Sequence, residues 1–119
     1  MIYGIGIDVV KVSRIEKSME NPAFLKRCFS KEEFEERANK KAESFAAAFA
    51  AKEAFSKAMG TGIKSMALNE VSLLHEASGK PYIKLTGETL EKANSLSLKI
   101  HVSATHEAGL AQCVVILEA

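Results

Sequence analysis

The chain has 119 residues, 47% of them apolar, and this length predicts one domain over residues 1–119 with a core of its own. Its 16 Lys and Arg nearly balance its 15 Asp and Glu, which argues against a strongly basic nucleic-acid or membrane-surface protein; a charged partner must therefore bind a local patch. The chain has two cysteines, and no apolar run nears the roughly 20 residues that span a bilayer. We therefore expect a cytoplasmic protein with reduced thiols.

The first strand is predicted over residues 2–10, where side chains alternate as strand geometry requires. One face carries Tyr3, Ile5, Ile7 and Val9, and the other carries Gly4, Gly6 and Asp8. Glycines in a strand let another backbone or a ligand come close, so the face around Asp8 is open to approach. The commoner use of an Asp at a strand end is as a turn former or helix cap, and that alternative stays open.

Three short helices follow, each with a start signal. Ser13 and Glu16 form a capping box for a helix to about Met19, and Asn21-Pro22 starts a second helical segment through Arg27. The third signal, over residues 29–34, is the strongest. Ser30 and Glu33 form another capping box, and Phe29 and Phe34 stand at the positions of a hydrophobic staple, which predicts a helix from Lys31 to about Ala38.

The stretch FAAAFAAKEAFSKAMGTG at 45–62 predicts a long helix that is apolar on almost every side and ends at Gly60. Glu53 and Lys57 lie about 40° apart on adjacent turns. They are either an ordinary surface pair worth a few tenths of a kcal/mol or functional groups. Burying them without partners would cost more than that gain, which favours function. Lys52 receives no role, and we expect its aliphatic stem to carry the amine to water.

The second half of the chain predicts mainly strands. They are expected over residues 67–75, 82–85, 98–105 and 110–117, with a hairpin turn at 77–81. A helix capped by Thr86 and ending at about Ser95 separates the two strand pairs. Helices first and paired antiparallel strands later predict an α+β fold.

Two carboxylates and a lysine suggest phosphate chemistry. Asp8 and Glu53 together would suit a hard divalent cation that takes its other oxygens from water and a phosphate. Lys57, one turn from Glu53, would hold the same phosphate as a point charge. His106 ends a polar strand segment, where a histidine is more often a surface group than an acid, base or ligand. Zinc is disfavoured because no potential ligands have the close spacing of zinc motifs.

Four motifs together resemble a known family. They are GIGID at 4–8, FAAKEAFSKAMGTGI at 49–63, GKPYI at 79–83 and HVSATH at 101–106. In order and spacing they are similar to holo-(acyl-carrier-protein) synthases, small bacterial phosphopantetheinyl transferases, over essentially the whole chain. The resemblance implies transfer of 4′-phosphopantetheine from coenzyme A to a serine of apo acyl carrier protein in fatty acid biosynthesis, releasing adenosine 3′,5′-bisphosphate. It also implies the phosphopantetheinyl transferase fold, a small antiparallel sheet packed with the long helix and short helices.

The resemblance implies roles for individual residues. Asp8 and Glu53 would bind Mg²⁺, Lys57 a phosphate, His106 the coenzyme A phosphates and Lys40 the ribose 3′-phosphate. The turn that would hold the adenine side consists of Gly79, Lys80 and Pro81. The catalytic set is then Asp8, Glu53, Lys57 and His106, and the base for the serine proton is His106, a carboxylate or a metal-bound water.

The resemblance further implies partners. Acyl carrier protein is acidic, and its expected docking patch consists of Lys11, Arg14, Lys17, Lys26 and Arg27; the alternative is an ordinary solvated helix face. Family members are homotrimers with active sites between subunits. The sequence departs from the family at Ala48, where a basic or polar residue is usual, so we expect one phosphate or interface contact to differ. Ala48 also motivates an alternative function, a non-catalytic module that binds coenzyme A or acyl carrier protein.

Overall fold

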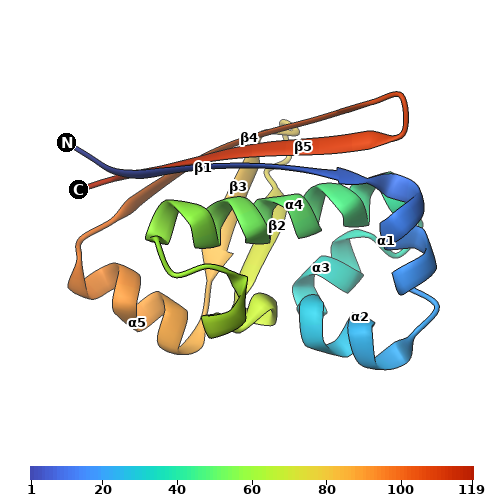
Figure 1. The fold of residues 1–119 in the computed structure, drawn as a ribbon, viewed down its shortest axis with the longest axis horizontal. Helices are drawn as coiled ribbons and strands as arrows, with labels where there is room; N and C mark the ends of the chain where they lie inside the picture. The colour runs from blue at the N-terminus through green and yellow to red at the C-terminus, as the bar shows by residue number, and fades with distance from the viewer.

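A long helix lies between a three-stranded sheet and a hairpin (Figure 1). The computed structural model describes all 119 residues. The sheet is antiparallel, in the order β1 (Ile2–Lys11), β5 (Leu110–Glu118) and β4 (Lys99–Glu107), and helix α4 (Ala42–Met59) runs along one face of it. The hairpin pairs β2 (Val71–His75) with β3 (Pro81–Leu85). The predicted α+β class and the long helix are confirmed.

Shorter helices lie at the two ends of α4 (Figure 1). At one end lie α1 (Val12–Ser18), α2 (Pro22–Cys28) and α3 (Lys31–Glu36); at the other lies α5 (Gly87–Ser95). Two 3₁₀ turns, η1 (Ile63–Ser65) and η2 (Leu68–Glu70), connect α4 to β2. The turn η2 occupies residues that were predicted as strand, so β2 begins at Val71 and not at residue 67. None of the helices has the length and apolar content needed to cross a lipid bilayer.

The glycines of β1 serve the contact with α4. A carbon added at Gly6 would lie 1.9 Å from the carbonyl oxygen of Ala54, and one added at Gly4 would lie 1.9 Å from that of Ala58. The backbone of α4 therefore approaches β1 more closely than a side chain at Gly4 or Gly6 would allow. Of the two predicted uses of these glycines, the structure shows the approach of another backbone.

This packing leaves the apolar face of β1 uncovered. Tyr3, Ile5, Ile7 and Val9 are between 46% and 60% exposed, although they are large apolar side chains. Side chains on the same outer face of β5 include Val114 and Ile116, which are half-buried. The result is a continuous apolar strip on the outside of the sheet, which we call the outer sheet face.

The helix caps test the local predictions. Asn21 caps α2, and Ser30 and Glu33 form the predicted capping box of α3, which ends at Glu36. The predicted box of Ser13 and Glu16 is wrong, because β1 runs directly into α1 and Ser13 lies inside the helix. Gly60 ends α4 in the left-handed conformation, as predicted.

The cap of α5 comes from a distant residue. The Thr86 side chain makes no capping hydrogen bond. Glu70 Oε1 instead accepts from the Thr89 backbone N–H at 3.2 Å and from its hydroxyl at 2.8 Å. Gly87 lies beside it with a φ of +60°, which favours glycine, and a carbon added there would lie 1.8 Å from a Glu70 carboxylate oxygen and displace this cap.

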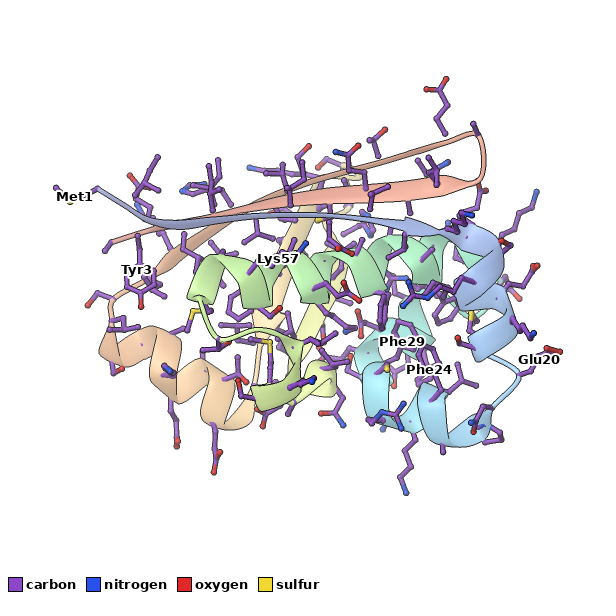
Figure 2. All side chains as sticks on the ribbon, viewed as in Figure 1. Met1, Tyr3, Glu20, Phe24, Phe29 and Lys57 are labelled. Carbon is purple, nitrogen blue, oxygen red and sulfur yellow. The ribbon has the colours of Figure 1, made fainter.

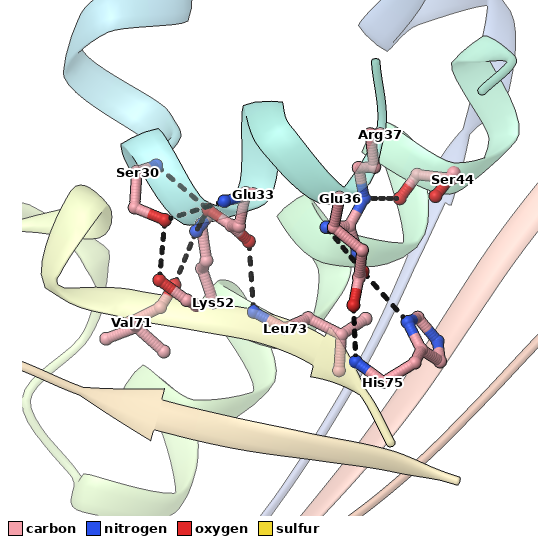
Figure 3. A network of polar contacts seen from close by, with 10 residues as sticks. Ser30, Glu33, Glu36, Arg37, Ser44, Lys52, Val71, Leu73 and His75 are labelled. Atoms are coloured by element: carbon pink, nitrogen blue, oxygen red, sulfur yellow. Dashed lines mark hydrogen bonds and ion pairs between the residues drawn. The ribbon is translucent and has the colours of Figure 1, made fainter. Parts of the chain in front are cut away.

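Lys52 does not reach water. It is fully buried, and its Nζ donates to Glu33 Oε1 at 2.6 Å (Figure 3). It also donates to two backbone oxygens, Leu68 O at 3.2 Å and Val71 O. Glu33 also accepts from the Leu73 backbone N–H at 3.0 Å. The expectation for Lys52 is therefore wrong: its amine connects α4 with α3 and with the start of β2.

An aromatic cluster packs beside this network. Phe24 and Phe29 lie next to each other near the short helices (Figure 2), with ring centroids 6.0 Å apart. Phe29 meets Phe34 edge to face at 6.1 Å, which confirms the predicted staple, and meets Phe45 of α4 at 5.2 Å. Through these contacts the aromatic rings pack α2 and α3 against the first half of α4.

Candidate active site

The structure brings Asp8, Glu53 and Lys57 together. Lys57 reaches from α4 toward β1 (Figure 2), where its Nζ donates to Ile7 O at 3.0 Å and to Asp8 Oδ1 at 3.3 Å. The Asp8 side chain is 10% exposed, whereas that of Lys57 is 54% exposed. The close approach of α4 at Gly4 and Gly6 is what places the helix side chains within reach of Asp8.

The two carboxylates perturb each other. The pKa of Glu53 is raised from 4.5 to about 7, first by burial and then by the charge of Asp8 and a hydrogen bond with it. The cations Arg14 and Lys57 act in the opposite direction. Asp8 Oδ2 is buried and has no hydrogen-bond partner. Arg14 and Lys57 compensate this pair only in part, since the pKa of Glu53 stays raised and Asp8 Oδ2 has no donor, so the pair is chemically suited to a further cation.

The donor set limits which cation fits. The chain has no group of three or more His, Cys, Asp or Glu side chains arranged around one point. Two carboxylates alone suit Mg²⁺, which keeps several waters and takes further oxygens from phosphates, better than they suit a metal held by protein ligands only.

A separate cleft contains other residues of the predicted site. It has a volume of about 900 Å³ and lies between the α3–α4 connection, the start of α4, and the ends of β2 and β4. Lys40, Gly79 and His106 line it, whereas Lys80 and Pro81 do not. His106 Nδ1 lies 3.2 Å from Glu43 Oε2.

The predicted residues therefore form two groups and not one. Asp8, Glu53 and Lys57 are absent from the lining of the cleft. The ten residues of α4 from Glu43 to Glu53 correspond to about 15 Å along the helix axis. Within one chain, α4 thus connects a carboxylate pair near its middle to a cleft at its N-terminal end.

The cleft contains residues that the motifs did not indicate. Glu36, Glu43 and His75 line it, and they form the pairs Glu36 with His75 and Glu43 with His106. No local pattern indicates these residues, since each pair joins positions more than 35 residues apart. The sequence signals at this cleft were the motifs HVSATH and GKPYI and the residue Lys40, and none of them includes Glu36, Glu43 or His75.

Arg14 of α1 adjoins the carboxylate pair. Arg14 is close enough to Glu53 to lower the pKa of its carboxyl. All five residues of the predicted docking patch are exposed: Lys11, Arg14, Lys17, Lys26 and Arg27. Whether the patch binds a partner stays a prediction.

Ala48 lies inside the chain, with no exposed surface. A basic residue at this position of α4 would have to displace its packed neighbours to reach a phosphate. Whether the presence of Ala48 alters a phosphate or interface contact stays a prediction. Ala48 is a packing residue of the core.

Comparison with known proteins now places the chain in a family. Residues 4–113 match the model of the ACPS 4′-phosphopantetheinyl transferase superfamily. The chain belongs to the 4′-phosphopantetheinyl transferase superfamily. It is 43% identical to a holo-[acyl-carrier-protein] synthase of Treponema denticola over 99% of both chains. It is 40% identical to that of Clostridium tetani over 99% of this chain and 97% of the other.

Solved synthases have the same fold. The holo-[acyl-carrier-protein] synthase of Neisseria meningitidis matches with a TM-score of 0.91 at 33% identity over all of both chains. The synthase of Bacillus anthracis, solved in complex with CoA (3′,5′-ADP), matches with a TM-score of 0.83 at 34% identity over 100% of this chain and 98% of that one. The chain therefore has the phosphopantetheinyl transferase fold that its motifs predicted.

Proposed function

We propose that this protein transfers 4′-phosphopantetheine from coenzyme A to a serine hydroxyl of apo acyl carrier protein, a step that supplies fatty acid biosynthesis. The observation that carries the proposal is the Asp8–Glu53 pair beside Lys57, with the raised pKa of Glu53 and the unpartnered Asp8 Oδ2. The relatives support it, since they are named holo-[acyl-carrier-protein] synthases and one was solved with coenzyme A.

The residues suggest how the chain would act. The serine hydroxyl gives its proton to a base, for which His106 and the carboxylates are the candidates on this chain, and its oxygen attacks the phosphorus bonded to the pantetheine oxygen. The bond from that phosphorus to the bridging oxygen breaks, releasing adenosine 3′,5′-bisphosphate. Asp8 and Glu53 would hold Mg²⁺, which neutralises charge on the pyrophosphate oxygens. Lys57 would contact the same phosphates, and its hydrogen bonds to Ile7 O and Asp8 Oδ1 hold the amine beside the carboxylate pair. In the cleft, Lys40 and His106 would hold the phosphates of the nucleotide.

We propose acyl carrier protein as the partner of the patch on α1 and α2. The patch adjoins Glu53 through Arg14, so a carrier protein bound there would present its serine near the carboxylate pair. Opposite charge across such an interface mainly speeds encounter. Cys28 and Cys113 are buried and unpaired, which fits the proposed cytoplasmic location.

We propose that the protein assembles as a homotrimer. Two observations support assembly: the exposed apolar side chains of the outer sheet face, and the separation of the carboxylate pair from the cleft within one chain. A neighbouring copy covering this face would bury the apolar strip and could complete the site. Sedimentation equilibrium should give three times the chain mass, and Ile5→Glu should shift it to the monomer. A parent protein that is monomeric at micromolar concentration would contradict the trimer.

A mass-spectrometric assay tests the transfer. Apo acyl carrier protein incubated with coenzyme A and Mg²⁺ should gain the mass of phosphopantetheine. Glu53→Gln should lower the rate by at least about a hundredfold, because it removes one of two charged metal ligands. The matched control is Glu91→Gln, an exposed residue of α5, which should keep the parent rate.

The non-catalytic binding module predicts a different result. The protein would bind coenzyme A or carrier protein, but the carrier protein would gain no mass even at a high concentration of the proposed enzyme. That result would refute the proposed transfer.

A further inference from the structure

His75 is a cleft residue to which the motifs assign no role. It ends β2 and lines the cleft together with Glu36, Glu76 and Gly79. Its Nδ1 lies 3.0 Å from Glu36 Oε2, and its backbone N–H donates to Glu36 Oε1 at 2.6 Å (Figure 3). Glu36 therefore holds both the backbone and the ring of His75.

Glu36 is itself held by a buried cation. Arg37 NH1 lies 3.2 Å from Glu36 Oε2, and the Arg37 side chain is 1% exposed. Arg37 Nε donates to Ser44 O at 3.2 Å, while its two terminal nitrogens find no acceptor with hydrogen-bond geometry. The charges of Glu33 and Glu36 together compensate this buried guanidinium, and the ion pair with Arg37 holds the Glu36 carboxylate in place.

The contacts of Glu36 decide which ring nitrogen of His75 carries a hydrogen. A carboxylate only accepts, so His75 Nδ1 donates to it. In the neutral ring, Nε2 is then left with a lone pair and no hydrogen. His75 therefore offers a hydrogen-bond acceptor at the cleft.

The charges of the cleft indicate which part of a ligand meets this acceptor. Lys40 and Lys41 provide positive charge at the α3–α4 connection, which suits phosphates. Glu36 and Glu76 stand beside His75, and two carboxylates there repel a phosphate. An uncharged group that donates a hydrogen bond is the better partner for His75.

We infer that His75 is a specificity-determining residue: its Nε2 accepts a hydrogen bond from the exocyclic amine of an adenine base, so the cleft prefers adenine to hypoxanthine nucleotides. The inference rests on the proposed function, which makes coenzyme A the nucleotide. Hypoxanthine carries an oxygen in place of that amine, and two acceptors would then face each other. One hydrogen bond of this kind changes the affinity by about tenfold.

Calorimetric titration tests the preference without requiring catalysis. The ligands are adenosine 3′,5′-bisphosphate and inosine 3′,5′-bisphosphate, which differ at the base. The parent should bind the adenosine compound about tenfold more tightly, and His75→Phe, which keeps a flat ring without Nε2, should bind both within about twofold. The matched control is Lys84→Ala. The Lys84–Glu32 pair, at 2.7 Å, also connects the hairpin to α3 but lies outside the cleft, so this variant should keep the parent preference.

The outcomes separate the inference from the proposed function. Four results would each overturn the role of His75. They are equal affinities of the parent for the two ligands, an unchanged preference for adenine in His75→Phe, an equal loss of that preference in Lys84→Ala, and binding of neither ligand. If the preference follows the expected pattern but acyl carrier protein gains no mass, the role of His75 stands and the proposed transfer fails.

The role of Glu36 as a positioning residue has its own readout. Nitrogen-15 NMR of the His75 ring should show the hydrogen on Nδ1 in the parent. In Glu36→Leu the ring should shift toward the form with the hydrogen on Nε2, and the preference for adenine should fall with it. Identical ring spectra in the two proteins would overturn this role.

Discussion

The carboxyl of Glu53 should make the metal-free protein less stable as the pH rises. Its pKa is raised from 4.5 to about 7, first by burial and then by Asp8. Between these two values the folded chain keeps a proton that the unfolded chain has released. The free energy of unfolding therefore falls across this interval, with no loss below about pH 4.5 and the full loss above about pH 7.

The size of the loss follows from the same pKa values. The difference between the folded and unfolded pKa of Glu53 corresponds to about 3 kcal/mol of unfolding free energy, since each pKa unit is worth ~1.4 kcal/mol. Because Glu53 is only partly buried and therefore screened by water, we expect about 2 kcal/mol. Glu53→Gln resembles the protonated parent, so it should equal the parent at acid pH and exceed it by about 2 kcal/mol at pH ~8.

Urea unfolding of both proteins near pH 5 and pH 8 measures this difference. The solutions contain a chelator and one fixed protein concentration, since assembly would change the apparent stability. Glu91→Gln, which is exposed on α5, is the control for a change of net charge. Adding Mg²⁺ near pH 8 should stabilise the parent more than Glu53→Gln. The reasoning is refuted if the parent and Glu53→Gln lose stability in parallel between the two pH values.

Three further changes test the packing. Lys52→Met should lower the free energy of unfolding by about 3–5 kcal/mol, because Glu33 then stays buried without its cation; adding Glu33→Gln should recover part of this in urea unfolding. Gly6→Ala should give little folded protein by circular dichroism, because the added carbon lies 1.9 Å from Ala54 O. Glu70→Ala should cost about 1 kcal/mol and speed amide exchange in the first turn of α5 but not in α4.

Local signals in the sequence predicted most of the elements. Asn21 and the Ser30–Glu33 box begin helices as expected, because a cap depends on residues within one turn. The box at Ser13 is wrong for a nonlocal reason. The backbone N–H of Val12, the first residue of α1, donates to Gly109 O in the β4–β5 turn at 2.9 Å, and β1 continues to Lys11 through its pairing with β5. The start of α1 is thus set by the sheet.

Lys52 and Glu53, adjacent on α4, show the same difference between what local sequence signals predict and what nonlocal contacts decide. Glu53 was predicted as a metal ligand from its place on an apolar helix, and the structure brings it to Asp8. Lys52, one residue earlier, was expected at the surface, yet it is fully buried with Glu33 as its partner. The sequence contains no sign of that pairing, since α3 and α4 become neighbours only after the chain folds.

The sequence by itself determined the order of the elements, the long helix and the candidate residues Asp8, Glu53 and Lys57, because each depends on periodicity or on a short motif. Only the tertiary structure decided that α4 covers the glycine face of β1 and leaves the apolar face open. It also separated the carboxylate pair from the cleft and placed His75 beside Glu36. These features depend on contacts between distant residues, and local periodicity does not specify which distant surfaces meet.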